Sequence, residues 1–228
     1  MKTIGLIGGM SWESSSLYYS YINLEISGIL GKNHSAKCLM YSFDFQEIED
    51  LQNKGDWLKL KKMIFDAGKI LKNAGAGFAA LCTNTMHKLT DNFEEEVGIP
   101  LLHIVDAVAE NIKTDKTSCV GLLGTRFTME DDFYVKRLNE KWNINTIVPE
   151  KRDRAEVDRI IYQELVKGLI LEESRIVMEK IINKMDKNGA GGVILGCTEI
   201  GMLVKEADCR LYDSAMIHSK KAALLSLS

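Results

Sequence analysis

The chain has 228 residues, of which 46% are hydrophobic, so it can bury a substantial core as one large domain or two small ones. Its 29 Lys and Arg nearly balance 32 Asp and Glu, and the basic residues are dispersed, which argues against a nucleic-acid or membrane-surface partner. No apolar run approaches the ~18 residues of a membrane span, and the first one is too short for a signal peptide, so we expect a cytoplasmic protein.

Five cysteines are spread along the chain without any Cys-x-x-Cys pair: Cys38, Cys82, Cys119, Cys197 and Cys209. An odd number with such wide spacing argues against a disulfide framework and against a structural zinc site. The histidines show no metal-ligand spacing either, and we expect no metal. Each cysteine is therefore either a small buried hydrophobe or a reactive thiol.

The first half of the chain alternates predicted strands and helices. Residues 2–7 form an apolar run that predicts a strand, and Gly8-Gly9-Met10-Ser11 predicts a tight loop before a helix capped by Ser11 or Ser14. The glycine spacing differs from G-x-G-x-x-G, so we expect no nicotinamide or flavin cofactor. Further along we expect strands at 37–43, 78–81 and 100–104, a polar loop at 46–56, and helices at 57–71 and 106–112.

The second half repeats this plan. Ile4-Gly5-Leu6-Ile7-Gly8 recurs as Val120-Gly121-Leu122-Leu123-Gly124. A strand at 143–148, an amphipathic region at 156–185, a strand ending at Cys197 and a last helix after Asp213 follow. The pattern predicts an α/β protein with two pseudo-symmetric, parallel-sheet, Rossmann-like domains. We expect residues 1–105 with 212–228 to form the first domain and residues 106–211 the second.

Two motifs lie where predicted buried strands end. One is Leu81-Cys82-Thr83-Asn84-Thr85-Met86-His87, and the other is Val193-Ile194-Leu195-Gly196-Cys197-Thr198-Glu199. Ligands of parallel α/β sheets bind at the carboxyl ends of the strands, where Gly8-Gly9-Met10 and Gly124-Thr125-Arg126 also lie. We therefore expect the active site in the cleft between the two domains.

The thiols of these motifs suit proton transfer at a carbon acid. If one group removes a proton and a group on the opposite side returns one, the carbon is inverted. Free cysteine has a pKa of about 8.5, and a helix N-terminus lowers it, so we expect a thiolate to be accessible near neutral pH.

The motifs resemble those of the aspartate/glutamate racemase family. The resemblance rests on Gly8-Gly9-Met10-Ser11, Asn84-Thr85 and Gly196-Cys197-Thr198-Glu199, and it extends over essentially the whole chain, including Asp44-Phe45 and the segment 213–218. It is closest to the bacterial subgroup of broad-specificity or aspartate/glutamate-specific racemases. The resemblance implies a two-domain, cofactor-independent isomerase that acts on a small amino-acid substrate as a homodimer.

The first motif departs from the family pattern, which is Cys-Asn-Thr. Here Thr83 precedes Asn84, and Cys82 lies one residue earlier. An ungapped alignment of 75–77 with 189–191 pairs Thr83 with Cys197, whereas a shift of one residue pairs Cys82 with Cys197 instead. Neighbouring strand residues point to opposite faces, so only one of the two can face the substrate. We favour Thr83, because only then does the family's Asn-Thr align, and Cys82 remains the alternative.

The resemblance implies that Cys197 removes the α-proton of the L-enantiomer. A threonine hydroxyl is too weak an acid to provide a standing base, so we expect Thr83 to act as a relay or positioning group and the enzyme to favour L-substrates. The resemblance implies that Met10 and Gln52 line the substrate pocket, and we expect Asn84, Thr85, Thr125, Thr198 and Glu199 to bind the substrate as well. Among these, Glu199 can accept from the ammonium group, and the hydroxyl and amide side chains can donate to carboxylates.

Two other functions are compatible with the sequence. One is another reaction of the same superfamily, such as hydantoin racemisation or a decarboxylation. The other is a non-catalytic amino-acid-binding protein that has lost one thiol. His87, which ends the first motif one helical turn after Thr83, either tunes the local field or is a polar residue whose hydrogen bonds are satisfied.

Overall fold

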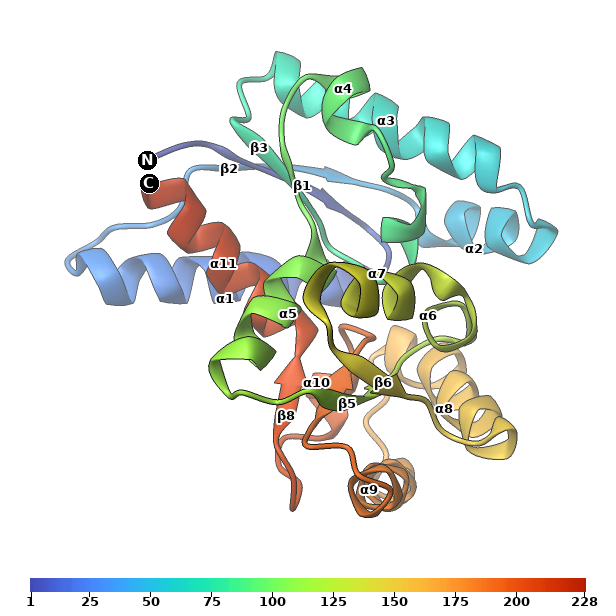
Figure 1. Ribbon diagram of the computed structural model, residues 1–228. Helices are drawn as coiled ribbons and strands as arrows, with labels where there is room; N and C mark the ends of the chain where they lie inside the picture. The colour runs from blue at the N-terminus through green and yellow to red at the C-terminus, as the bar shows by residue number, and fades with distance from the viewer. The chain divides into compact units, whose positions relative to one another are not determined.

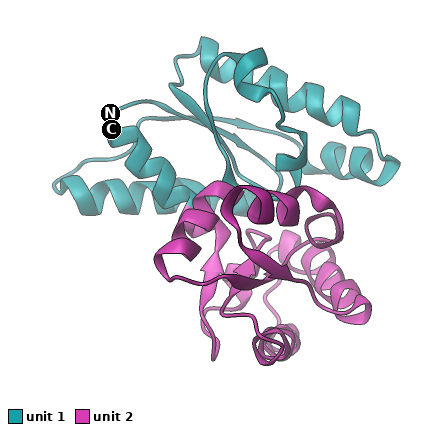
Figure 2. Cartoon of the chain, in the orientation of Figure 1, with its two compact units in different colours: residues 1–104, 218–228 teal, residues 105–217 magenta.

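The structure is a computed structural model that describes residues 1–228, and it divides into two compact units (Figures 1 and 2). Unit 1 contains residues 1–104 and 218–228, and unit 2 contains residues 105–217. The chain thus enters unit 2 after Ile104 and returns to unit 1 at His218. The return point lies inside the last helix, farther along the chain than the expected boundary between residues 211 and 212.

Each unit contains one four-stranded sheet in which every pair of neighbouring strands is parallel. The order is β2-β1-β3-β4 in unit 1 and β6-β5-β7-β8 in unit 2, so the same plan occurs twice and the predicted fold class is confirmed. The strands are β1 Ile4–Gly8, β2 Cys38–Ser42, β3 Phe78–Leu81, β4 Leu101–Leu102, β5 Cys119–Leu123, β6 Asn145–Ile147, β7 Val193–Leu195 and β8 Leu211–Asp213.

Helices connect the strands of both sheets. Before the chain passes into unit 2, it forms α1 Trp12–Leu30, α2 Phe45–Lys54, α3 Trp57–Asn73, the 3-10 helix η1 Thr85–Leu89 and α4 Phe93–Val97. The remaining helices are α5 Ile104–Thr114, α6 Arg126–Glu130, α7 Asp132–Trp142, α8 Lys151–Gln163, η2 Leu165–Lys167, α9 Glu172–Lys187, α10 Ile200–Leu203 and α11 Ser214–Leu227. Unit 2 begins within α5 and ends within α11. None of these helices combines the length and apolar character that a membrane crossing requires.

The expected polar loop at 46–56 is wrong, because most of this segment forms α2. The Asp44 side chain accepts from the peptide N–H of Gln46, and Gly55 ends the helix in the left-handed conformation. Ile48 and Leu51, three residues apart, are buried on one face of the helix. Of the two serines that the sequence offered as the cap of α1, Ser11 is the one, since its side chain accepts from the Ser14 N–H.

Each unit packs around its own apolar core. In Figure 1, α3 and α4 lie on one side of the unit 1 sheet, and α1 and α11 lie on the other. Strands covered on both faces appear in the sequence as continuous apolar runs, which explains why β1 and β3 could be predicted. The unit 1 core includes Leu60, Ile64 and Phe93, and the unit 2 core includes Ile160 and Ile182.

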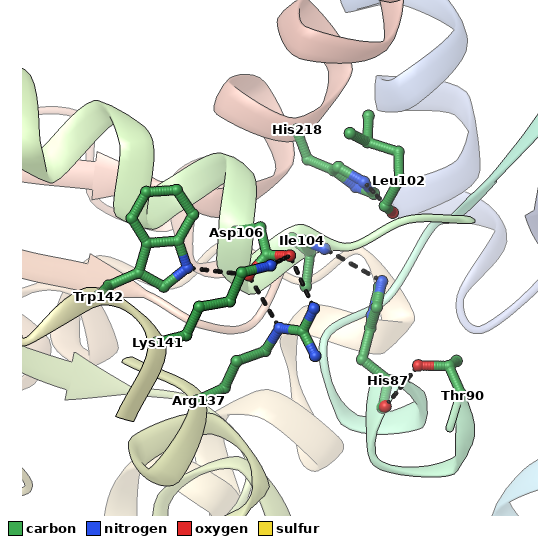
Figure 3. Close-up of polar contacts among 9 residues, drawn as sticks. All are labelled: His87, Thr90, Leu102, Ile104, Asp106, Arg137, Lys141, Trp142 and His218. Carbon is green, nitrogen blue, oxygen red and sulfur yellow. Dashed lines mark hydrogen bonds and ion pairs between the residues drawn. The ribbon is translucent and has the colours of Figure 1, made fainter. Parts of the chain in front are cut away.

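A half-buried carboxylate anchors α5 to α7 within unit 2 (Figure 3). Asp106 accepts from Nε and a terminal nitrogen of Arg137 at 2.9 and 2.7 Å, from Lys141 Nζ at 2.8 Å and from Trp142 Nε1 at 2.9 Å. Burial opposes ionisation, but the hydrogen bonds from these three donors dominate together and hold the pKa of Asp106 well below its ordinary value. We assign this cluster to the scaffold, because all of its donors are directed at one carboxylate.

Candidate functional site

In unit 1, the first motif begins where β1 and β3 end together. Ile7 pairs with Leu81, and the peptide N–H of Cys82 donates to the Ile7 carbonyl at 2.9 Å. Cys82 therefore still belongs to the hydrogen-bonded ladder between the strands. Thr83 is the first residue beyond that ladder.

In unit 2, the second motif has the same geometry. Leu123 pairs with Leu195, and the peptide N–H of Gly196 donates to the Leu123 carbonyl at 2.6 Å. By this ladder, Cys82 corresponds to Gly196 and Thr83 corresponds to Cys197. Backbone hydrogen bonds thus define the same correspondence as the ungapped sequence alignment.

The two neighbouring residues of the first motif differ in environment. Cys82 is 0% exposed, whereas Thr83 is 8% exposed, the same fraction as Cys197. Burial raises the pKa of the Cys82 thiol far above its ordinary value, so this thiol stays protonated. The Cys82 carbonyl accepts from the Ser14 hydroxyl at 3.0 Å, which ties this strand end to α1.

A carboxylate contacts the candidate thiol of unit 2. The Cys197 Sγ donates to Glu199 Oε2 at 3.0 Å, and the Thr198 hydroxyl donates to the same oxygen at 2.7 Å. All three residues are buried. The carboxylate that accepts both bonds can also take up the thiol proton and so act as the adjacent general base that an activated cysteine requires.

The expected lowering of the Cys197 pKa by a helix N-terminus is wrong. Burial first, and then the charge and hydrogen bond of Glu199, raise the pKa of Cys197 well above its ordinary value. The following helix, α10, begins only at Ile200 and has four residues, so its dipole is small. Cys197 is therefore a thiol when no substrate is bound.

The other predicted site residues of unit 1 are buried near the first motif. Gln52 Nε2 contacts Met86 Sδ at 3.4 Å, which places α2 against η1. Met10 belongs to the same apolar cluster as Met86. Asn84 and Thr85, which follow Thr83 directly, are both buried.

The remaining predicted residue of unit 2, Thr125, caps α6. Its hydroxyl accepts from the peptide N–H of Thr128 at 3.4 Å and lies 3.3 Å from the Thr128 hydroxyl. Thr125 follows β5, as Cys197 follows β7, and the pairing of those strands brings both residues to the same edge of the sheet. Apart from Gln52, which lies in α2, the predicted residues of each unit thus follow the carboxyl ends of its central strands.

Two further polar residues influence the motif residues, namely Asp158, which no sequence pattern marked, and His87 of the first motif. Asp158 in α8 accepts from the peptide N–H of Arg126 at 2.7 Å, and its charge contributes to the raised pKa of Cys197. His87 contacts the Thr83 carbonyl through Nδ1 at 2.8 Å. No group of three or more His, Cys, Asp or Glu side chains is arranged to hold a metal ion.

The chain matches a known family over nearly its whole length. The sequence model described as "Asp/Glu/Hydantoin racemase" matches residues 7–224. A curated relative, the broad specificity amino-acid racemase RacX of Bacillus subtilis (strain 168), is 22% identical over 222 residues, which are 95% of each chain.

Solved structures agree with this match. A protein described as a candidate Asp/Glu racemase from Yersinia pestis is 49% identical with a TM-score of 0.92, and 100% of each chain is covered. An aspartate racemase homologue from Pyrococcus horikoshii OT3 is 38% identical with a TM-score of 0.85, again over 100% of both chains.

Proposed function

The chain belongs to the Asp/Glu/Hydantoin racemase family, a family of isomerases, and we propose that it interconverts the enantiomers of aspartate and glutamate. The observation that carries the proposal is the hydrogen bond of 3.0 Å between Cys197 Sγ and Glu199 Oε2. Racemisation of an amino acid requires removal of its α-proton, and a thiol paired with a carboxylate can supply a base for that step.

In the proposed reaction, Glu199 first accepts the proton of the Cys197 thiol. The resulting thiolate removes the α-proton of the L-substrate, so that Cys197 becomes a thiol again and the α-carbon carries the electron pair. The Thr83 hydroxyl then gives its proton to the opposite face of that carbon, which yields the D-enantiomer, and takes a proton back from water. Glu199 gives the proton that it accepted to the hydroxide that this leaves, so both groups return to their starting states. No redox change occurs, and no cofactor takes part in these steps.

The proposal includes a bias toward L-substrates. The residue that corresponds to Cys197 in unit 1 is Thr83, whose hydroxyl is too weak an acid to form a standing base. Cys82, the nearest thiol in the sequence, is fully buried and belongs to the strand ladder. A D-substrate therefore lacks a competent base on the side from which its α-proton must leave.

Substrate recognition is assigned to hydroxyl and amide donors. Asn84, Thr85, Thr125 and Thr198 supply donors for carboxylate oxygens, and Met10 supplies its backbone. Gln52, whose side-chain amide contacts the thioether of Met86, supplies a donor for the distal carboxylate. This neutral amide, in place of a cation, agrees with a range of substrates wider than aspartate alone.

The proposed setting is a reducing one. All five cysteines are free, and a base such as Cys197 works only as a free thiol. We assign the enzyme to the cytoplasm and, following the family, to a homodimer. Sedimentation at micromolar concentration tests the dimer.

The exchange of the α-proton with heavy water tests the proposal. We expect L-aspartate to lose its α-proton signal with the wild-type enzyme and with Cys82→Ala, and to keep it with Cys197→Ala. Each variant removes one thiol from one of the two motifs, so Cys82→Ala serves as the matched control for Cys197→Ala. If the wild-type protein is stabilised by aspartate without any exchange, it is a binding protein and the proposal fails.

A further inference from the structure

Two backbone groups contact opposite nitrogens of one buried imidazole. His87 in η1 is 3% exposed. Its Nδ1 lies 2.8 Å from the Thr83 carbonyl oxygen. Its Nε2 lies 3.2 Å from the peptide nitrogen of Ile104 (Figure 3). The ring therefore links the first motif to the segment that follows β4.

These contacts define the protonation state of the ring. A peptide N–H can only donate, so Nε2 of His87 accepts from Ile104 and carries no proton. A carbonyl can only accept, so Nδ1 carries the proton and donates it to Thr83. His87 is thus a neutral imidazole. A second proton, on Nε2, would point at the peptide N–H of Ile104.

Hydrogen bonds also hold the backbone of His87. The peptide carbonyl of His87 accepts from the Thr90 hydroxyl at 2.8 Å and from the Thr90 N–H at 3.3 Å (Figure 3). The peptide N–H of His87 donates to the Asn84 carbonyl at 3.1 Å. With both its backbone and its ring held, His87 has little freedom to follow a displacement of Thr83.

A second buried histidine holds the same segment from the other side. His218 Nε2 donates to the Leu102 carbonyl at 2.9 Å (Figure 3). Its Nδ1 accepts from the Tyr18 hydroxyl at 2.8 Å. The rings of His87 and His218 lie 5.8 Å apart between centroids. Residues Leu102 to Ile104 are thus fixed at a carbonyl by one histidine and at an N–H by the other.

We propose that His87 is a positioning residue for Thr83, which it ties to the segment Leu102–Ile104 so that the Thr83 hydroxyl keeps one orientation during the second proton transfer. This inference rests on the function proposed above. Thr83 follows the last ladder hydrogen bond of β3, so its backbone is not fixed by the sheet. The bond from His87 fixes its carbonyl, and the fixed backbone in turn limits the directions available to its side chain.

The simpler alternative is that His87 only satisfies buried polar groups. Loss of a buried hydrogen bond lowers the free energy of unfolding whatever the site does. A purely structural role therefore predicts that variants lower stability and reduce both proton transfers together. A positioning role predicts a split, because only the transfer through Thr83 depends on the orientation of that residue.

Two amide substitutions separate the roles of the two ring nitrogens. In His87→Asn, the shorter side chain places its NH2 near the position of Nδ1 and can still donate to Thr83. In His87→Gln, the longer side chain can place its carbonyl near Ile104 but loses the donor to Thr83. His34→Gln serves as the control, because His34 is exposed and lies outside both motifs.

Two rates are measured with L-aspartate in heavy water, namely loss of the α-proton signal and formation of the D-enantiomer. We expect His87→Gln to lower D-aspartate formation at least ~10-fold while α-proton loss stays within about twofold of wild type, since small misplacements of a reacting group are costly. His87→Asn should keep D-aspartate formation closer to the wild-type value. His34→Gln should match wild type in both rates.

Two results overturn the inference: an equal fall of both rates in His87→Gln, or a loss of D-aspartate formation in His87→Asn as large as in His87→Gln. Failure of the underlying function has a different signature. In that case the wild-type enzyme and His34→Gln would already show no α-proton loss. Thermal unfolding of each variant confirms that the rates refer to folded protein.

Discussion

Thr83 occupies the position in unit 1 that Cys197 occupies in unit 2. Each is the second residue after a pair of strand residues, Ile7 with Leu81 in one unit and Leu123 with Leu195 in the other. The two sheets thus present one hydroxyl and one thiol at corresponding positions. The predicted difference between L- and D-substrates follows from this difference between two side chains.

Restoring a thiol in unit 1 should supply the missing base. We expect Thr83→Cys to increase α-proton exchange from D-aspartate by at least ~10-fold, because a positioned general base contributes factors of this size or larger. Exchange from each enantiomer is followed by proton NMR in heavy water. The same gain should persist in Thr83→Cys combined with Cys82→Ala, which removes the native neighbouring thiol. No gain from the D-enantiomer would contradict the assigned correspondence.

Replacing the carboxylate beside Cys197 should make the thiol more acidic. After burial, the charge and hydrogen bond of Glu199 are the causes that raise the pKa of Cys197, and Glu199→Gln removes the charge. We expect alkylation of Cys197 by iodoacetamide, followed by mass spectrometry, to begin at lower pH in this variant. Racemisation should fall, because an amide cannot accept the thiol proton.

The control for this prediction is Glu206→Gln, since Glu206 is an exposed carboxylate. Its alkylation profile should match that of wild type. An unchanged or higher alkylation midpoint in Glu199→Gln would show that burial alone determines the acidity of Cys197.

The buried His218 should make stability depend on pH. Burial lowers its pKa in the folded state to about 4 from an ordinary value of 6.5. Between these pH values the unfolded chain binds more protons, so the free energy of unfolding should fall as the pH falls, by up to about 3 kcal/mol. Above about pH 6.5 this contribution is fully present, and below about pH 4 no further loss occurs.

Urea unfolding of wild type and His218→Gln at pH 7 and pH 5 measures this contribution. The variant should be less stable at pH 7, because Leu102 and Tyr18 lose a partner, and its stability should change less between the two pH values. His34→Gln should keep the wild-type dependence. If the stability of His218→Gln changes with pH as much as that of wild type, the pH dependence comes from other groups.

Much of the fold could be predicted from the sequence, because its central strands are covered on both faces. The apolar runs of β1 and β3 end at glycine or at polar side chains, so their carboxyl ends were visible in the sequence. The helix α2 could not be predicted, because its outward face is polar and only Ile48 and Leu51 are apolar residues on its buried side. The strand β8 has three residues, too few to show a period.

The candidate site was predictable in position but not in its chemical state. The sequence left two possible registers for the first motif, and the ladder bond from Cys82 to Ile7 distinguishes them geometrically. The acidity of Cys197 depends on burial and on the Glu199 side chain folding back onto it. The contact of His87 with Ile104 joins residues 17 positions apart, which no local pattern encodes.

The central claim is that Cys197 is the single working base, with Thr83 acting as the second group. The most direct measurement is the loss of the α-proton signal from L-aspartate and, separately, from D-aspartate in heavy water with the wild-type enzyme. We predict fast loss from the L-enantiomer and at least ~10-fold slower loss from the D-enantiomer, as expected when one of two general bases is missing. Equal rates from both enantiomers would show two competent bases and contradict the account.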